Sequence, residues 1–422
     1  MHVCVLGAGI VGLTTAYELR QRGYQVTVVD RAHSGAGASG GNGAQLSYSY
    51  VQPLADPSVW AQLPKLLLSA DSPLKFRLQW DVRQWLWGVQ FLRACNTDTS
   101  CSTTQKLLLL AARSRAGLEL AMRSHGLACD YSNTGKLVLY NNAESFASAQ
   151  RQMDLQAHLG CVQEAVSAQR CVDIEPALQT YQPQIVGAIY TPSECAADCF
   201  KMCLALEVLL RRQGVQFLLG TELQGFTHSH DITTAAKTSV GDVQADQFVL
   251  AMGAGSTCAA RWLGVRLPVY PLKGYSITLD LNLDQSLTAP VVNVTDAARK
   301  VVFARVGQRL RVAGMAELVG HDYSITTERI ESLQRSTQAV FPQCDVQGNH
   351  HAWTGMRPAT PTGLPIVGRI IKAPNNLLFN TGHGALGFTL AFGTAAMVAE
   401  LVSKTQPTQL GQSFSVKSPY VA

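Results

Sequence analysis

The feature that most constrains this chain is the group of glycines that follows its first apolar segment. Gly7, Gly9 and Gly12 come directly after the apolar run 3–6 in the spacing GxGxxG, and a largely apolar segment begins near Ile10. In this spacing the first glycine permits a tight turn and the second lets the backbone approach a pyrophosphate, while the following helix directs free N–H groups toward it. The start of the chain therefore predicts a strand, a glycine turn and a helix that bind a dinucleotide.

An acidic residue closes this unit. The next apolar strand, 26–29, ends at Asp30, about 20 residues beyond the glycines, where a carboxylate can accept hydrogen bonds from a ribose 2′-OH. A 2′-phosphate would be repelled by the same carboxylate. The following loop, 31–45, is rich in Gly, Ser and Ala, which allow a ligand to approach the backbone closely. The glycines alone do not decide between NAD and FAD.

Composition sets broad limits on partners and location. A length of 422 residues suggests two or three domains, and a net charge of +5 is too small and too scattered to indicate nucleic-acid binding. Eleven cysteines without a CxxC pair are typical of reduced thiols in a reducing compartment. No basic, apolar leader precedes the first strand, so we expect a cytoplasmic location.

Three cysteines raise the question of a metal site. Cys195, Cys199 and Cys203 lie four residues apart, a spacing that would place them on one face of a helix. Buried thiols in a core stripe are the favoured interpretation, because cluster ligands usually come from loops. An iron–sulfur or metal role is the alternative, and we expect no metal.

Beyond residue 100 the pattern alternates between helices and strands and then changes. We expect helices over 106–125, 143–159 and 198–213, and strands over 135–140, 188–191, 215–219 and 245–252. From Pro268 onward polar turns separate alternating apolar residues, which predicts an antiparallel sheet. The chain ends with a further strand, LLFN, and a glycine turn that leads into an apolar segment, 384–399, too short to span a membrane.

A stretch rich in Trp, Leu and Arg between Trp60 and Arg93 has two interpretations. The aromatic and aliphatic residues are Trp60, Leu63, Leu66, Leu67, Trp80, Trp85, Trp87, Phe91 and Leu92, and the basic residues among them are Lys65, Lys75, Arg77, Arg83 and Arg93. An ordinary amphipathic helix pair on a domain surface is favoured. The alternative is an interfacial membrane contact, with aromatic groups inward and basic groups toward the headgroups.

Six motifs together resemble one flavoprotein family along nearly the whole chain. They are VLGAGIVGLTTAYEL, GNGAQLSYSY, VYPLKGYSIT, RVAGMAELVG, WTGMRPATPTGLPIVGR and NTGHGALGFTLA. The chain is similar to D-amino-acid oxidases and glycine oxidase, and within that family it most resembles the small subunit of bacterial D-amino-acid dehydrogenase. The resemblance implies FAD as the cofactor. It also implies an α/β fold in two parts, a discontinuous Rossmann-like FAD-binding domain (1–50, 150–262 and 348–422) and a substrate domain of antiparallel sheet and helices (51–149 and 263–347).

The resemblance assigns cofactor-binding residues to several parts of the chain. The ADP portion would lie on Gly7, Gly9, Ile10, Val11, Gly12, Asp30 and Arg31, with the adenine near Leu223. Asn42, Gly43, Ala44 and Gln45 would line the isoalloxazine, and Gly253 would pack on the cofactor. Gly382, His383, Gly384, Gly387, Phe388 and Thr389 would lie at the pyrimidine carbonyl, where negative charge develops on reduction.

The resemblance also places Arg357 at the position that holds the substrate carboxylate. A guanidinium can bind a carboxylate through two hydrogen bonds, and Pro358 keeps the preceding residue extended. The alternative is an arginine in a surface salt bridge. Tyr50 and Tyr275 are further substrate-binding candidates. Lys273 either contacts the flavin or is solvated or ion-paired.

The activity implied by the resemblance is oxidative deamination. A hydride passes from Cα of a D-amino acid to flavin N5, and the imine is hydrolysed to a 2-oxo acid and ammonia. No acid or base side chain is obligatory, and electrons would pass to a quinone or another acceptor. The enzyme would then be cytoplasmic or peripheral on the inner face of the membrane.

Three alternatives remain open from the sequence. They are an amino-acid or secondary-amine oxidase that uses oxygen, the flavin subunit of a multisubunit dehydrogenase, and a tRNA-modifying flavin oxidase. Glycine oxidase has a tyrosine in the strand equivalent to 300–305 and an arginine at Ala385, whereas this chain has neither. The substrate of glycine oxidase is therefore not assigned to this chain. No nucleic acid is expected as a partner.

Overall fold

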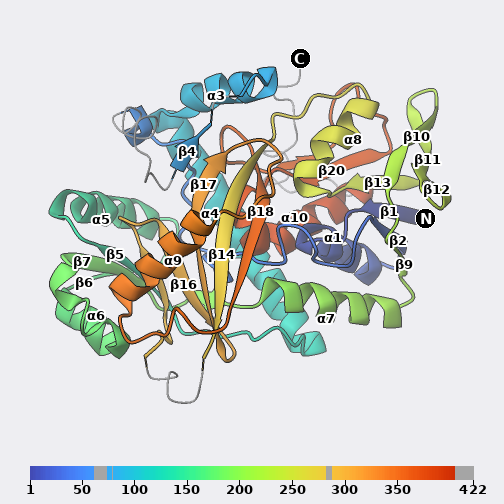
Figure 1. Cartoon of the computed structure of the whole chain (residues 1–422). Coiled ribbons are helices and arrows are strands. Elements are labelled where there is room, and N and C mark those ends of the chain that lie inside the picture. The colour runs from blue at the N-terminus through green and yellow to red at the C-terminus, as the bar shows by residue number, and fades with distance from the viewer. Residues whose placement is uncertain (61–73, 78, 282–287, 404–422) are drawn as a thin grey trace.

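Two large sheets organise the chain, of which the computed structural model describes residues 1–60, 74–77, 79–281 and 288–403 (Figure 1). The first sheet has six strands in the order β19-β20-β13-β1-β2-β9. Their bounds are β1 (His2–Leu6), β2 (Gln25–Asp30), β9 (Gln216–Leu219), β13 (Gln247–Leu250), β19 (Ile366–Gly368) and β20 (Leu377–Thr381). All neighbours are parallel except β19 and β20. With α1 (Ile10–Gln21) between β1 and β2, the predicted dinucleotide-binding unit is confirmed as a strand, turn, helix and strand.

Helices cover one face of this sheet. They are α1, α4 (Thr97–His125), α7 (Cys199–Arg212) and α10 (Gly387–Val402), and α10 packs against both α1 and α4. The other face carries the small sheet of β10 (Leu223–Ser229), β11 (Ile232–Thr238) and β12 (Gly241–Gln244), together with α8 (Ser256–Trp262). The segment Gly384–Val402 is long and apolar enough to cross a membrane, but two thirds of it (67%) is buried inside the fold. We therefore describe α10 as a core helix.

The second sheet has nine strands and mixed topology. Its main path is β18-β14-β17-β16-β15-β5-β7-β6, and β4 pairs with β17. The bounds are β4 (Leu74–Phe76), β5 (Lys136–Tyr140), β6 (Glu164–Val166), β7 (Gly187–Thr191), β14 (Tyr270–Asp280), β15 (Asn293–Asp296), β16 (Val301–Val306), β17 (Arg309–Leu318) and β18 (His350–Ala359). Most pairs are antiparallel, as predicted, but β15–β5 and β17–β4 are parallel.

The two faces of this second sheet have different neighbours. Alternate residues of β14, including Tyr275 and Ile277, pack in one cluster with Ile330 and Leu333 of α9 (Thr327–Val340). The intervening residues face the opposite way, because side chains alternate along a strand. Ser276, for example, donates a hydrogen bond of 2.7 Å to the carbonyl of Gly41. The face opposite α9 is thus the one that meets the loop after β2.

The remaining elements lie around these two sheets. They are the two-stranded sheet of β3 (Gln45–Leu46) and β8 (Cys195–Ala196), the helices α3 (Val82–Ala94), α5 (Ala143–Ala157) and α6 (Ala168–Ile174), and the 3₁₀ turns η1 (Pro176–Leu178), η2 (Gln182–Gln184), η3 (Gly253–Gly255) and η5 (Gly384–Leu386). Helix α4 begins earlier than predicted, because the side chain of Asn96 caps it by accepting from the Thr99 N–H at 2.9 Å.

The predicted α/β class is confirmed, while strand pairing differs from the predicted domain bounds at three strands. Strands β6 and β7 fall within 150–262, and β18 falls within 348–422, yet all three pair in the nine-stranded sheet. Local alternation of apolar residues identifies a strand but not its neighbours. The chain therefore crosses between the two sheets more often than its composition suggested.

The prediction that the three cysteines lie on one face of a helix is wrong. Cys195 lies in β8, whereas Cys199 and Cys203 lie on α7, so the three do not share one helix. All three are buried in the main core cluster, as the favoured interpretation predicted. Within the described ranges no group of three metal-ligating side chains is found.

The packing of α10 can be tested at Phe392, whose ring is 2% exposed and meets Tyr17 of α1 edge to face. We expect Phe392→Ala to lower the free energy of unfolding by about 3–5 kcal/mol, because a large cavity is left between α1 and α4. Urea denaturation followed by circular dichroism measures this. Leu120→Ala, at a residue 58% exposed on α4, is the matched control and should change stability by less than about 0.5 kcal/mol.

Candidate functional site

The glycine turn after β1 is shaped by two close backbone approaches. Gly7 has a φ of +116°, and a Cβ there would lie 2.5 Å from the carbonyl oxygen of Ala251. A Cβ at Gly12 would overlap the carbonyl of Gly7. Gly9 differs, because its nearest neighbour would be the Ser39 hydroxyl at 3.4 Å. Gly7 and Gly12 are thus required by the fold itself, and Gly9 leaves the approach to the turn open, which fits a pyrophosphate there.

Asp30 is tied directly to this turn. Its carboxylate accepts hydrogen bonds from the Ala8 N–H at 2.7 Å and the Ala32 N–H at 2.9 Å. The Thr221 N–H donates to the Asp30 carbonyl at 2.8 Å, which brings the buried start of β10, Leu223, to this edge. A carboxylate has about four lone-pair positions, so a ribose hydroxyl can still be accepted. Arg31 follows with an exposed side chain.

The carboxyl ends of β1, β13 and β20 meet at one edge of the six-stranded sheet. Thr381 at the end of β20 donates to the carbonyl of Gly253 after β13 at 3.0 Å. A Cβ added at Gly253 or at Gly384 would meet nothing within 4 Å. In open parallel sheets this edge is where nucleotides bind. The glycines predicted at both ends of the chain are therefore gathered at this edge of the six-stranded sheet.

His383 in this C-terminal turn is directed into the protein. The ring is 3% exposed, and its Nε2 lies 3.1 Å from the hydroxyl of Thr394 on α10. Burial lowers the pKa of His383 to about 3, so the ring is neutral at physiological pH. The backbone forms an isolated bridge with Ala359 at the end of β18. His383 thus joins the C-terminal glycine turn to the second sheet.

The segment Asn42–Gln45 crosses from the first sheet to the second. The Asn42 side chain accepts from the Ala44 N–H at 2.9 Å, and Ala44 has a φ of +61°, a conformation that is unusual for a residue with a side chain. A Cβ on Gly43 would contact Val302 at 3.0 Å, so this residue lies against the sheet. The Gln45 amide donates at 3.1 Å to carbonyls of both β15 and β16. Contacts with the nine-stranded sheet therefore fix the position of this loop.

Two buried charges fix the residues that follow. The Glu194 carboxylate is 1% exposed and accepts from the N–H groups of Tyr48 at 2.7 Å and Ser49 at 2.6 Å. The Lys136 ammonium donates to the Ser47 hydroxyl at 2.8 Å and lies 4.4 Å from the centre of the Tyr50 ring. Burial lowers the pKa of Lys136 to about 8, and nearby Glu194 opposes this. The same burial raises the pKa of Glu194.

The C-terminal turn contacts this segment as well. The Thr389 hydroxyl, at the start of α10, accepts from the Ser47 N–H at 3.3 Å, and the neighbouring Phe388 is buried in the main core. Two segments that the resemblance assigns to the flavin, 42–45 and 387–389, are thus held close together. Their proximity, with the open space beside Gly253 and Gly384, fits the chemistry of an FAD site.

Arg357 lies on β18 on the face opposite α9. Its Nη1 donates at 2.8 Å to the carbonyl of Met315, and a Cβ at Gly274 would overlap the guanidinium. Met315 has a φ of +61° and occupies a β-bulge in β17, which turns its carbonyl toward Arg357. Burial lowers the pKa of Arg357 to about 10. Among the described residues no carboxylate lies within ion-pair distance, so the surface salt bridge is not observed and the group is available to an anion.

The other substrate candidates are not brought to Arg357. Tyr275 and Lys273 project from the opposite face of β14, where the Tyr275 hydroxyl donates to Glu317 at 2.8 Å and the Lys273 ammonium donates to the Ser324 carbonyl at 2.5 Å. Tyr50 lies over Lys136 on β5, five strands from β18 in the sheet order. Arg357 is therefore the one predicted substrate residue whose surroundings suit a carboxylate directly.

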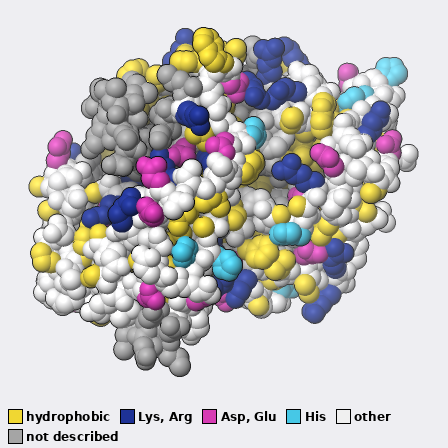
Figure 2. All heavy atoms as spheres, in the orientation of Figure 1, with side chains coloured by type: hydrophobic (Ala, Val, Ile, Leu, Met, Phe, Trp, Pro, Cys, Tyr) yellow, Lys and Arg dark blue, Asp and Glu magenta, His cyan; other side chains and the backbone are white. Residues whose placement is uncertain are grey.

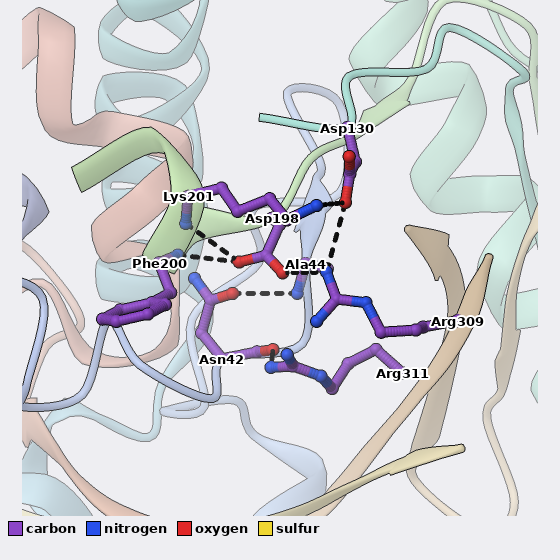
Figure 3. A network of polar contacts seen from close by, with 8 residues as sticks. All are labelled: Asn42, Ala44, Asp130, Asp198, Phe200, Lys201, Arg309 and Arg311. Carbon is purple, nitrogen blue, oxygen red and sulfur yellow. Dashed lines mark hydrogen bonds and ion pairs between the residues drawn. The ribbon is translucent and has the colours of Figure 1, made fainter. Parts of the chain in front are cut away.

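A polar network joins α7 to the second sheet (Figure 3). Asp198 caps α7 by accepting from the N–H groups of Phe200 and Lys201, and its other oxygen accepts from Arg309 at 2.7 Å. Arg309 also reaches Asp130 at 3.1 Å. In the same view Arg311 donates to the carbonyl of Asn42 at 2.9 Å.

The site residues predicted from the sequence did not include Arg311, Lys136 or Glu194. For Arg311 a signal exists, because the alternation in RLRVAG places Arg309 and Arg311 on one face of a strand. For Lys136 and Glu194 the signal is weaker, since each is a single charge within an apolar stretch. No local sequence pattern predicts the β-bulge at Met315.

The chain matches known proteins over nearly its whole length. The family described as DAO, FAD dependent oxidoreductase, matches residues 2–401. Among curated relatives, the chain is 44% identical to D-amino acid dehydrogenase 2 of Ralstonia nicotianae (96% of this chain, 97% of the relative) and 40% identical to D-amino acid dehydrogenase 2 of Pseudomonas aeruginosa (96% of each).

Solved structures share this fold at low identity. Glycine oxidase from Bacillus cereus superimposes with a TM-score of 0.76 at 19% identity, covering 99% of each chain. L-proline dehydrogenase from P. horikoshii gives 0.75 at 20%, covering 98% of this chain and 96% of that one. The chain belongs to the DAO family of FAD-dependent oxidoreductases. FAD as the predicted cofactor is thereby confirmed.

The burial of His383 predicts that the folded protein becomes less stable as the pH falls. Its pKa is about 3 in the folded protein, against 6.5 for the free side chain, so the unfolded chain binds the extra proton as pH falls through this window. We expect the free energy of unfolding to decrease between about pH 6.5 and pH 3, by roughly 4 kcal/mol at 1.36 kcal/mol per pKa unit. Denaturant unfolding of the wild type and of His383→Asn across this range measures it. An equal pH slope in the variant would contradict the assignment.

Proposed function

We propose that this chain is an FAD-dependent dehydrogenase that oxidatively deaminates D-amino acids. The observation that carries the proposal is Arg357, a half-buried guanidinium with no carboxylate partner among the described residues. It lies two residues before Ala359, which forms a backbone bridge with His383 of the C-terminal glycine turn. The names of the two curated relatives support the substrate class and its D configuration. The nearly complete coverage of both chains supports a shared activity.

The chain's own residues supply binding and orientation. Bound FAD would accept the hydride that leaves Cα of the substrate. Arg357 would hold the carboxylate through two N–H groups, and the Met315 carbonyl and Gly274 fix the guanidinium before substrate binds. Such fixed positioning lowers the entropic cost of bringing Cα to the cofactor. The imine product is hydrolysed by water to a 2-oxo acid and ammonia, so no acid or base residue is assigned.

The carboxylate role of Arg357 can be tested by Arg357→Lys. We expect the variant to keep its flavin and lose about 2–5 kcal/mol of transition-state binding, because an ammonium cannot reproduce two parallel hydrogen bonds. Steady-state assays with a dye acceptor and a panel of D- and L-amino acids measure this as kcat/KM. Arg335→Lys, at an exposed residue of α9, is the control. Unchanged kinetics in Arg357→Lys would move the carboxylate site elsewhere.

We further propose that electrons leave to a membrane quinone and that α3 forms the membrane contact. On α3 the side chains of Val82, Trp85, Leu86 and Val89 are 48–71% exposed at helical spacing, and Trp80 before the helix is fully exposed. Figure 2 shows hydrophobic and basic side chains along the upper edge of the molecule, where α3 lies in Figure 1.

The opposite side of α3 supports this choice. Trp87 and Phe91 are buried, and Trp87 Nε1 donates at 2.9 Å to the carbonyl of Ala359, two residues beyond Arg357. A lipid contact at α3 would therefore bring the substrate strand close to the membrane. Of the other residues in the predicted contact, Leu63, Lys65, Leu66 and Leu67 lie outside the described residues, as does the side chain of Lys75.

The membrane contact predicts that the protein floats with anionic liposomes. We expect Trp85→Glu to abolish flotation, because it places a carboxylate in the apolar face. Val208→Glu, at a 50% exposed residue of α7, should leave it unchanged. The same wild-type preparation should reduce a soluble quinone faster than it forms hydrogen peroxide. Peroxide formed as fast as quinol, without flotation, would identify a soluble oxidase.

A further inference from the structure

Arg311 is a buried cation that the proposed substrate site does not use. It lies on β17 with 6% of its surface exposed, on the sheet face that meets the loop after β2. Its Nη1 donates to the carbonyl of Asn42 at 2.9 Å, and its Nε has no hydrogen-bond partner among the described residues (Figure 3). A buried guanidinium with an unsatisfied N–H is costly unless a ligand completes it.

The carboxylates nearby are already engaged. Asp198 caps α7 and accepts from Arg309, while Asp130 accepts from Arg309 and, at 2.7 Å, from Lys201. Two carboxylates therefore face three cations when Arg311 is included. Burial raises the pKa of the Cys199 thiol well above its usual value, so this neighbour stays neutral. The cluster keeps one positive charge in excess, and of its three cations Arg311 is the one without an ion pair to a described residue.

The positions of Arg311 and Arg357 on the sheet separate Arg311 from the site proposed for the substrate carboxylate. Thr278 lies opposite Arg311 and Leu272 lies opposite Arg357, so the two arginines are six residues apart along β14. At about 3.3 Å per residue this is about 20 Å between their attachment points. The two guanidinium groups also donate to different carbonyls. The excess positive charge at Arg311 therefore suits an anion other than the substrate carboxylate.

We propose that Arg311 supplies the positive charge that stabilises the reduced, anionic flavin. The proposal rests on the proposed function, since Asn42, whose carbonyl Arg311 contacts, begins the segment assigned to the isoalloxazine. Two-electron reduction adds negative charge to the flavin, and a fixed cation in a water-poor site stabilises that charge more than water would. Arg311 would therefore raise the flavin reduction potential and act on electron transfer without binding substrate.

The test compares holoenzymes of the wild type and four variants. Arg311→Met and Arg311→Gln remove the charge, and Arg311→Lys keeps it. Arg335→Met is the control, because it removes one positive charge at an exposed residue of α9, outside the cluster. The flavin midpoint potential is measured by equilibration with a reference dye, and the dissociation constant of the anionic sulfite adduct is measured from the flavin spectrum.

We expect both neutral variants to favour oxidised over reduced FAD at least tenfold more than the wild type does, which lowers a two-electron potential by about 30 mV. Sulfite affinity should fall at least tenfold as well. In Arg311→Lys and in Arg335→Met, the ratio of oxidised to reduced FAD and the sulfite affinity should both stay within about threefold of the wild-type values.

A wild-type potential in Arg311→Gln, or equal shifts in Arg335→Met, would overturn the proposal. If Arg311→Met loses FAD, Arg311→Gln and Arg311→Lys still decide the question. A purified wild-type protein without flavin would instead contradict the proposed function, so the two failures are distinguishable.

Discussion

The structure depends on how the buried backbone of residues 41–50 is satisfied. This segment leaves the six-stranded sheet and crosses onto the nine-stranded sheet, where water is largely excluded and unpaired N–H and carbonyl groups would be costly. Its partners are side chains from distant parts of the chain. Ser276 and Arg311 donate to carbonyls of the segment, and Glu194 accepts two of its N–H groups. The conformation of this loop is therefore set only when both sheets are in place.

This dependence explains why the candidate site lies at the junction. The glycine turn after β1 and the turn before α10 belong to the first sheet, while Arg357 and the Met315 bulge belong to the second. Left-handed conformations at Ala44 and Met315 are unfavourable for residues with side chains, and each persists where surrounding contacts fix it. Cofactor and substrate groups thus come from different sheets, and the crossing segment sets their relative position.

Sequence patterns predicted those features that are encoded locally. The order strand, glycine turn, helix, strand over residues 2–30 follows from apolar runs and glycine spacing, and the structure confirms it. Pairing between remote strands has no local signal, so the assignment of β6, β7 and β18 to the nine-stranded sheet was not predicted. The same holds for Glu194 and Arg311, whose importance depends on which backbone groups they meet after folding.

Anaerobic titration of the purified flavoprotein with D-alanine, L-alanine and ethylamine, followed by flavin absorbance, tests whether Arg357 and FAD form one substrate site. D-alanine should bleach the flavin at low concentration. Ethylamine carries the same amine and side chain without the carboxylate, so it should not, because Arg357 then has no anion to bind. L-alanine should react far more slowly. Equal bleaching by ethylamine or by L-alanine would contradict a site for D-amino acids formed by Arg357 together with bound FAD.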